Sequence, residues 1–257
     1  MDWLQQLLLF GASLVANTLS ALAGGGAGLL QLPILLFLGL AFATALATHK
    51  IASIALGVGA TIRHFRNSSL NRRLAFFILA CGLPGVVSGA LLILKFDDHF
   101  SKLALGILTT GLGLYSIRKK DLGQADMERH RDTRGFLIGG AVLYIIGALN
   151  GSLTSGTGLF VTLWLVRWFG LEYKTAVAYT LVLVGLFWNG LGAFTLALQA
   201  PVQWNWLPAL LLGSLLGGYL GAHLSIIKGN QWVKRGFETI TLVVGIKLIY
   251  DALSALI

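Results

Sequence analysis

The chain carries the stretch GGGAGLLQLPILLFLGLAFATALAT at residues 24–48, and a second copy of its pattern follows at residues 156–178 as GTGLFVTLWLVRWFGLEYKTAVA. Each copy opens on glycines, continues through an apolar run to a single glycine, and then gives Thr-Ala-x-Ala. Gly170 lies 131 residues after Gly39, and Thr175 lies 131 residues after Thr44. A duplicated, glycine-broken hydrophobic unit is typical of secondary transporters, which build a binding site near the bilayer midplane from such breaks.

The composition predicts an integral membrane protein. Apolar residues make up 56% of the 257 residues and charged residues 11%, and stretches 3–48 and 175–222 contain no Asp, Glu, Lys or Arg. A helix needs roughly 20 apolar residues to cross about 30 Å of hydrocarbon, so each stretch is long enough for two or more crossings. A soluble protein of this size would show polar helix faces that are missing here. The lone Cys81 excludes an intrachain disulfide.

We expect an all-α bundle of two repeats with five apolar segments each. Segment 4–23 is assigned as a first span and not a cleaved signal, because the chain start lacks positive charge and the second half has a counterpart. The domain boundaries are 1–118 for the first repeat, 119–134 for a basic cytoplasmic linker and 135–257 for the second repeat. The expected segments are 4–23, 28–40, 44–62, 74–94 and 102–118, then 136–150, 158–169, 175–198, 204–226 and 233–255.

The basic residues predict the topology. The net charge is +9, and most of the basic residues are in loops between spans. This placement indicates that these loops are on the cytoplasmic side of the membrane, and it does not indicate nucleic-acid binding. If all ten segments cross, every one of these loop residues falls on one face, whereas re-entry of the two short segments would split them. Five crossings per repeat would invert the second repeat relative to the first. The residues concerned are Arg63, Arg66, Arg72, Arg73, Arg118, Lys119, Lys120, Arg129, Arg131, Arg134, Arg167, Lys174, Lys228, Lys234 and Arg235.

The two glycine breaks are expected to bind an anion. Each precedes a short segment, and the start of a helix offers free N–H groups and a partial positive charge. Two such breaks across a pseudo-twofold axis would form one neutral polar pocket; the alternative is that the glycines only permit close helix packing. The first break supplies Gly24, Gly25, Gly26 and Gly28, and the second supplies Ser155, Gly156, Thr157 and Gly158. Glycines repeated every fourth residue, at Gly213, Gly217 and Gly221 and at Gly85 and Gly89, are interpreted as packing surfaces.

Polar residues inside spans complete the expected substrate site. Lys50 is expected to attract an anion, and His49 is expected to carry a coupled proton, although Lys50 could instead extend to the nearby interface. Lys247 precedes Asp251 by four residues, which predicts a local ion pair. Other intramembrane amides, such as Asn189, are expected to join helices. The remaining residues assigned to the substrate site are Asn17, Gln31, Thr48 and Asn150.

No enzymatic constellation is present in the sequence. It has no metal-ligand spacing and no phosphate-binding loop, and no cytoplasmic segment could hold an ATPase domain. We therefore expect no cofactor and no enzymatic activity, and we expect a gradient-driven carrier of a small anion working by alternating access. A passive anion channel is the alternative, and an intramembrane enzyme or assembly factor is a third class. The sequence leaves the oligomeric state open.

The chain resembles the TauE/SafE family of sulfite exporters. The resemblance rests on the glycine cluster 24–28 followed by Pro33, the Gly39 stop and the Thr44–Thr48 element, with a partial second copy in which Trp164 stands where proline is usual. It spans nearly the whole chain. It implies a multi-pass inner-membrane transporter, often an exporter, of sulfite, a sulfonate or a related oxyanion.

Overall fold

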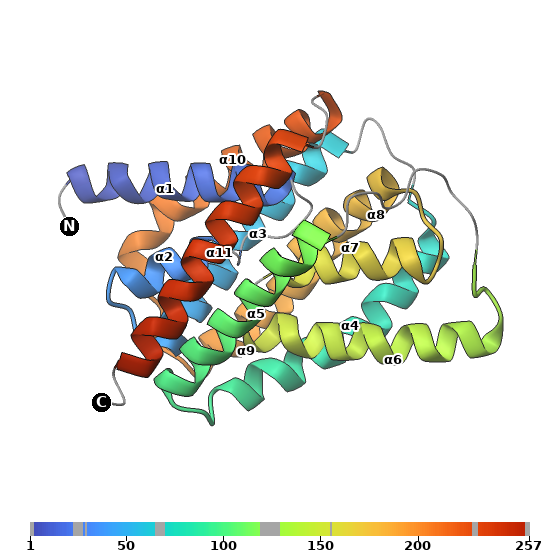
Figure 1. Cartoon of the computed structure of the whole chain (residues 1–257), viewed down its shortest axis with the longest axis horizontal. Coiled ribbons are helices and arrows are strands. Elements are labelled where there is room, and N and C mark those ends of the chain that lie inside the picture. Colours follow the sequence, from blue (N-terminus) through green and yellow to red (C-terminus); the bar gives the residue numbers. More distant parts are fainter. Residues whose placement is uncertain are drawn as a thin grey trace.

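The computed structural model describes residues 3–22, 28, 30–64, 70–118, 129–154, 156–227 and 231–254. Every regular element in these ranges is a helix (Figure 1), which confirms the predicted all-α class and all ten predicted segments. The first half contains α1 (Trp3–Leu22), α2 (Gln31–Phe37), α3 (Phe42–His64), α4 (Arg72–Ile93) and α5 (Asp98–Arg118). The second half contains α6 (Thr133–Ser152), α7 (Thr157–Arg167), α8 (Tyr173–Tyr179), η2 (Thr180–Trp188), α9 (Asn189–Ala197), η3 (Trp204–Trp206), α10 (Leu207–Ile227) and α11 (Gln231–Ser254).

Six helical stretches of the described chain are long and apolar enough to cross a membrane. They cover 20 to 23 residues each, which corresponds to about 30–35 Å at 1.5 Å per residue. They are Trp3–Leu22, Phe42–Arg63, Arg72–Ile93, Thr133–Ser152, Thr175–Ala197 and Trp204–Leu224. The chain is therefore a multi-pass membrane protein. The start of α1 and the end of α11 lie on the same side of the bundle in Figure 1.

The second segment of each half is a short helix. α2 has 7 residues and α7 has 11, or about 10 and 16 Å of helix, so neither spans the hydrocarbon as a helix alone. Each ends just before the glycine that the sequence marks as a stop, Gly39 with φ of 91° and Gly170 with φ of 71°. This left-handed conformation is readily adopted by glycine and ends a helix by satisfying its last carbonyls.

The two halves interlock because helices of the first half pack against helices of the second half. α1 of the first half packs on α10 of the second, α6 of the second packs on α4 of the first, and α5 packs on α11. The predicted glycine surfaces form these contacts. Gly217 faces the Leu14 carbonyl and Gly85 faces the Tyr144 carbonyl so closely that a methyl group would overlap it. The interpretation of these glycines as packing surfaces is confirmed, because small residues let helix backbones approach.

One span is wound differently from the others. Residues 173–197 form a continuous helix whose middle, η2, is π-helical over 9 residues. π-helical turns are rare and occur frequently at functional sites, because they shift the side chains that follow around the helix axis. Gly185 of η2 crosses Gly57 of α3 with no room for a side chain between them. Thr180 and Asn189 flank this crossing and face the interior.

Candidate functional site

Lys50 lies in the interior of the protein, about 12 Å along α3 at 1.5 Å per residue, and its side chain has 0% exposure. Its ammonium donates to Asn150 Oδ1 at 2.7 Å and to Asn189 Oδ1 at 3.0 Å. The alternative in which Lys50 extends to the membrane interface is therefore wrong. Its stem passes Gly192, whose Cβ position lies 3.4 Å from Lys50 Cε, so the aliphatic part is enclosed as well.

No carboxylate contacts the Lys50 ammonium among the described residues. Helices α1, α3, α4, α6, α7, α9 and α10 contain no Asp or Glu. Both oxygens that the ammonium contacts belong to neutral amides. An ammonium offers three donors, and two of them are used by described residues. Because an unpaired charge in a bilayer is costly, such residues are expected to mark substrate or ion pathways.

The two glycine breaks meet beside this ammonium. A Cβ on Gly28 of the first break would lie 2.9 Å from the Thr154 carbonyl oxygen of the second. Asn150 donates to Thr157 Oγ1 at 2.9 Å, and this hydroxyl in turn donates to the Thr154 carbonyl. Both breaks contribute to a small cavity. Its walls are Gly28, Leu56, Asn150, Thr154, Thr157, Gly158, Thr180, Leu181, Val184, Gly185 and Asn189.

The chemistry of this cavity suits an anion. The N-terminus of α7 opens on it, with Gly156 at the cap position and φ of 63°. Helix N-termini carry partial positive charge and free N–H donors. The Lys50 ammonium lies behind Asn150 and Asn189, which are both on the cavity wall. The hydroxyls of Thr157 and Thr180 are on the cavity wall, and each donates its proton to a backbone carbonyl, that of Thr154 and that of Ala176.

Three of the other predicted site residues, Asn17, Gln31 and His49, form a second network on an adjacent side of α3. His49 Nδ1 is 2.8 Å from Gln31 Oε1, and Gln31 Nε2 donates to Ser13 Oγ at 2.8 Å and to Ser214 Oγ at 3.2 Å. Asn17 Nδ2 donates to Ser214 Oγ at 3.0 Å. Asn17, Gln31 and His49 were predicted to lie in the same site as Lys50, but the structure separates the two groups.

Thr48 belongs to neither network. Its hydroxyl accepts a hydrogen bond from the Gln203 backbone N–H at 2.9 Å and so holds the loop before η3. The assignments of Gly24, Gly25, Gly26 and Ser155 lie outside the described residues. Asn189, Ser13 and Ser214 were not predicted to belong to a site from the sequence. The only available signal was their polarity within apolar spans, which was noted for Asn189 alone.

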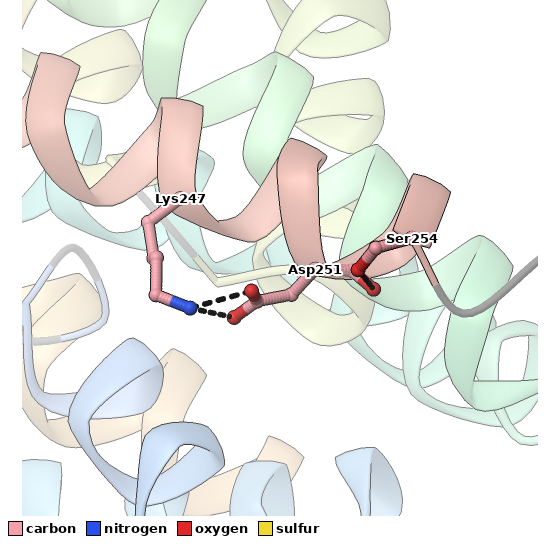
Figure 2. A network of polar contacts seen from close by, with 3 residues as sticks. All are labelled: Lys247, Asp251 and Ser254. Carbon is pink, nitrogen blue, oxygen red and sulfur yellow. Dashed lines mark hydrogen bonds and ion pairs between the residues drawn. The ribbon is translucent and has the colours of Figure 1, made fainter.

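Lys247 on α11 differs from Lys50, because it is paired with a carboxylate. Figure 2 shows it beside Asp251 on α11, with Nζ 2.7 Å from Asp251 Oδ2, and Ser254 one turn further on. The side chains are 56% and 34% exposed, so the pair contributes little to stability. The predicted local ion pair is confirmed. Among the described residues, no group of three or more His, Cys, Asp or Glu side chains could hold a metal ion.

The comparisons with known proteins give one consistent result. The family model described as "Sulfite exporter TauE/SafE" matches residues 9–248. A Haemophilus influenzae "Probable membrane transporter protein" is 31% identical over 95% of this chain and 94% of its own length. "Probable membrane transporter protein YfcA" of Escherichia coli is 29% identical over 95% of this chain and 90% of its own, and the Bacillus subtilis relative YunE is 21% identical over 96% and 98%. No solved structure matches.

Proposed function

The chain belongs to the sulfite exporter TauE/SafE family, and from this premise we propose that it is a secondary transporter, working as an exporter, of a small anion such as sulfite, a sulfonate or a related oxyanion. The observation that carries the proposal is Lys50, a fully buried lysine beside a polar cavity where both glycine breaks meet, whose partners among the described residues are two amide oxygens and no carboxylate. An anion in this cavity would supply the missing negative charge. The site belongs to the inner membrane, and no cofactor or enzymatic step enters the proposal.

We propose that residues 1–118 and 135–257 are inverted repeats joined by the linker 119–134. Two pairs of equivalent contacts and the direction of one helix pair support this. Gly85 faces the Tyr144 carbonyl as Gly217 faces the Leu14 carbonyl, which is the same contact with the halves exchanged. The His49–Gln31 contact recurs 131 residues later as the Thr180–Thr162 hydrogen bond, and both are 2.8 Å.

The direction of the α5–α11 pair supports inversion over a parallel duplication. Gly106 faces Ile249, whereas Thr110, further along α5, faces Gly245, which is earlier in α11. These equivalent helices therefore run antiparallel where they touch. A twofold axis in the membrane plane relates equivalent helices in this way, and an axis along the membrane normal does not.

The proposed mechanism is alternating access around the cavity. One wall of the cavity lies at the crossing of Gly57 and Gly185, where α3 meets the π-helical turn of η2, since Leu56, Val184 and Gly185 line it. Relative movement of these two helices would open the cavity toward one side at a time. Ten crossings are proposed, with the basic loops on the cytoplasmic side. The contacts among these loops support that assignment, since His130 stacks on Trp168 at 4.1 Å and the Asn71 N–H donates to Tyr179.

Flux from proteoliposomes tests the function. The purified protein is reconstituted, loaded in turn with labelled sulfite, thiosulfate, methanesulfonate and sulfate, and efflux is followed against concentration. We expect saturable, gradient-dependent efflux of at least one anion. Planar-bilayer recording distinguishes the channel alternative, because channel conductance far exceeds carrier turnover. Absence of saturable flux for all four anions would refute the proposal.

A matched pair of threonines tests the location of the site. Thr157→Val removes a cavity hydroxyl and the acceptor of Asn150, whereas Thr195→Val removes a hydroxyl bonded only to the Leu191 carbonyl of its own helix. We expect a KM at least several-fold higher for Thr157→Val and a KM near wild type for Thr195→Val. Equal KM values for the two variants would place the substrate elsewhere.

A further inference from the structure

The second network is a separate polar cluster inside the membrane. It consists of Ser13 and Asn17 on α1, Gln31 on α2, His49 on α3 and Ser214 on α10. Each of these residues is at most 1% exposed. His49 and Lys50 are neighbours on α3 but contact different partners, so the cluster lies beside the anion cavity and apart from it. Only His49 in this cluster can change its charge.

The hydrogen bonds of the cluster define which nitrogen of His49 holds the proton. Ser13 Oγ donates to the Leu210 carbonyl at 2.9 Å and therefore accepts from Gln31 Nε2. Since Gln31 Nε2 faces the serines, Gln31 Oε1 faces His49, and an amide oxygen only accepts. His49 Nδ1 must then be the donor in this contact. In the neutral imidazole the lone pair is consequently on Nε2.

Two acceptor atoms of the cluster receive no hydrogen bond from the part of the chain that the structure describes. His49 Nε2 and Asn17 Oδ1 are both buried, and neither has a hydrogen-bond partner among the described residues. Buried polar atoms are normally satisfied, so two orphaned acceptors in one cluster indicate a missing donor. A proton on Nε2 converts that atom from acceptor to donor, and the Nδ1 contact with Gln31 is kept.

We propose that the cluster is a proton site, in which His49 Nε2 takes up one proton from the aqueous side each time an anion binds at Lys50, and releases it on the other side with the anion. This inference rests on the proposed transport function. One N–H bond forms on uptake and the same bond breaks on release, so the net movement is one proton together with each anion.

The coupling follows from the adjacency of the two residues. A positive charge on His49 is disfavoured by the positive charge of Lys50 and becomes acceptable when an anion neutralises Lys50. Linkage requires the reverse as well, so a proton on His49 strengthens anion binding. Lys50 adjoins His49 on α3; of the other helices packed on α3, η2 and α9 contain no titratable residue, and Asp98 of α5 accepts from the Phe42 N–H about two turns before His49. α1 and α2 contain no titratable residue, and Tyr219 and His223 of α10 lie further along that helix, where His223 contacts Arg63.

The experiment compares His49→Gln with His223→Gln in the same proteoliposomes. Glutamine can keep the contact with Gln31 but cannot take up a proton. Initial rates with thiosulfate, methanesulfonate and sulfate, which stay fully ionised between pH 5.5 and 7.5, are measured with a pH-sensitive dye in the lumen. For wild type and His223→Gln we expect an apparent affinity about tenfold tighter at pH 5.5 than at pH 7.5, with proton movement accompanying the anion.

For His49→Gln we expect anion flux whose KM is independent of pH and which carries no proton. If sulfite is the one anion transported, part of it carries its own proton across the membrane. This proton is the same for wild type and His49→Gln, so the difference in proton movement between the two still reports the proton carried by His49. Anion flux in wild type without proton movement, flux driven by a sodium gradient instead, or proton coupling retained in His49→Gln would each overturn the inference. Absence of anion flux in wild type would refute the proposed function itself.

Discussion

Replacement of Lys50 by glutamine should abolish most of the affinity for the anion. The ammonium is fully buried and its two partners are neutral amide oxygens. One of these amides separates an anion in the cavity from the ammonium, so the two charges are about 7 Å apart and, at an effective dielectric constant of about 20, their attraction contributes about 2.4 kcal/mol. At about 1.4 kcal/mol per tenfold, the loss is roughly fiftyfold in affinity. Glutamine can still donate to Asn150 or Asn189, so the fold should be retained.

The matched control is Lys247→Gln on α11. That lysine is 56% exposed and already paired with Asp251, so its loss should change affinity by less than about fivefold, in line with surface ion pairs worth up to about 1 kcal/mol. KM is measured by proteoliposome flux, and folding is checked by thermal unfolding in detergent. Lys50→Arg, which keeps the charge, should retain part of the affinity. A Lys50→Gln variant that is folded and has a KM within threefold of wild type would show that Lys50 does not bind the anion.

Two further outcomes follow from the topology and the packing. In a Cys81-free background, the single-cysteine variants Arg73→Cys and Arg167→Cys should react with impermeant reagents added on the cytoplasmic side. The variant Gln199→Cys should react with the same reagents added on the opposite side. If the cysteines of Arg73→Cys and Arg167→Cys are labelled from opposite sides, the short segments re-enter the membrane and do not cross it. Gly89→Ala should lower thermal stability, since overpacking typically costs about 1–3 kcal/mol and a methyl there overlaps the Ala148 carbonyl. Gly11→Ala, with open space around it, should leave the melting temperature unchanged.

The positions of the helices were predictable because the bilayer imposes simple constraints. Apolar length, glycine stops and charge-free stretches are local properties, and they gave all ten segments within a few residues of their observed ends. The short second segment of each half and its stop at Gly39 or Gly170 were predicted for the same reason. The glycine surfaces were also predictable, since a four-residue spacing places them on one face of a helix.

The composition of the site was predictable only in part. Asn150, Thr157 and Lys50 were assigned correctly to one neighbourhood, because polar groups in an apolar span are conspicuous. The π-helical turn that precedes Asn189 left no mark in the sequence pattern, so the second partner of Lys50 was recognised only as a residue that joins helices. Thr48 was assigned to the site from its place in the repeat, and in the structure it holds a loop.

The sequence by itself determined that this is a helical membrane protein with a duplicated glycine break, because the cost of placing charge in lipid and the length of a span are both readable along the chain. Only the tertiary structure decided that His49 and Lys50, adjacent on α3, serve two different clusters. Consecutive residues on a helix point about 100° apart, and which neighbours they meet depends on helices far away in the sequence. Those contacts come from the interlocking of the two halves, which no local pattern contains.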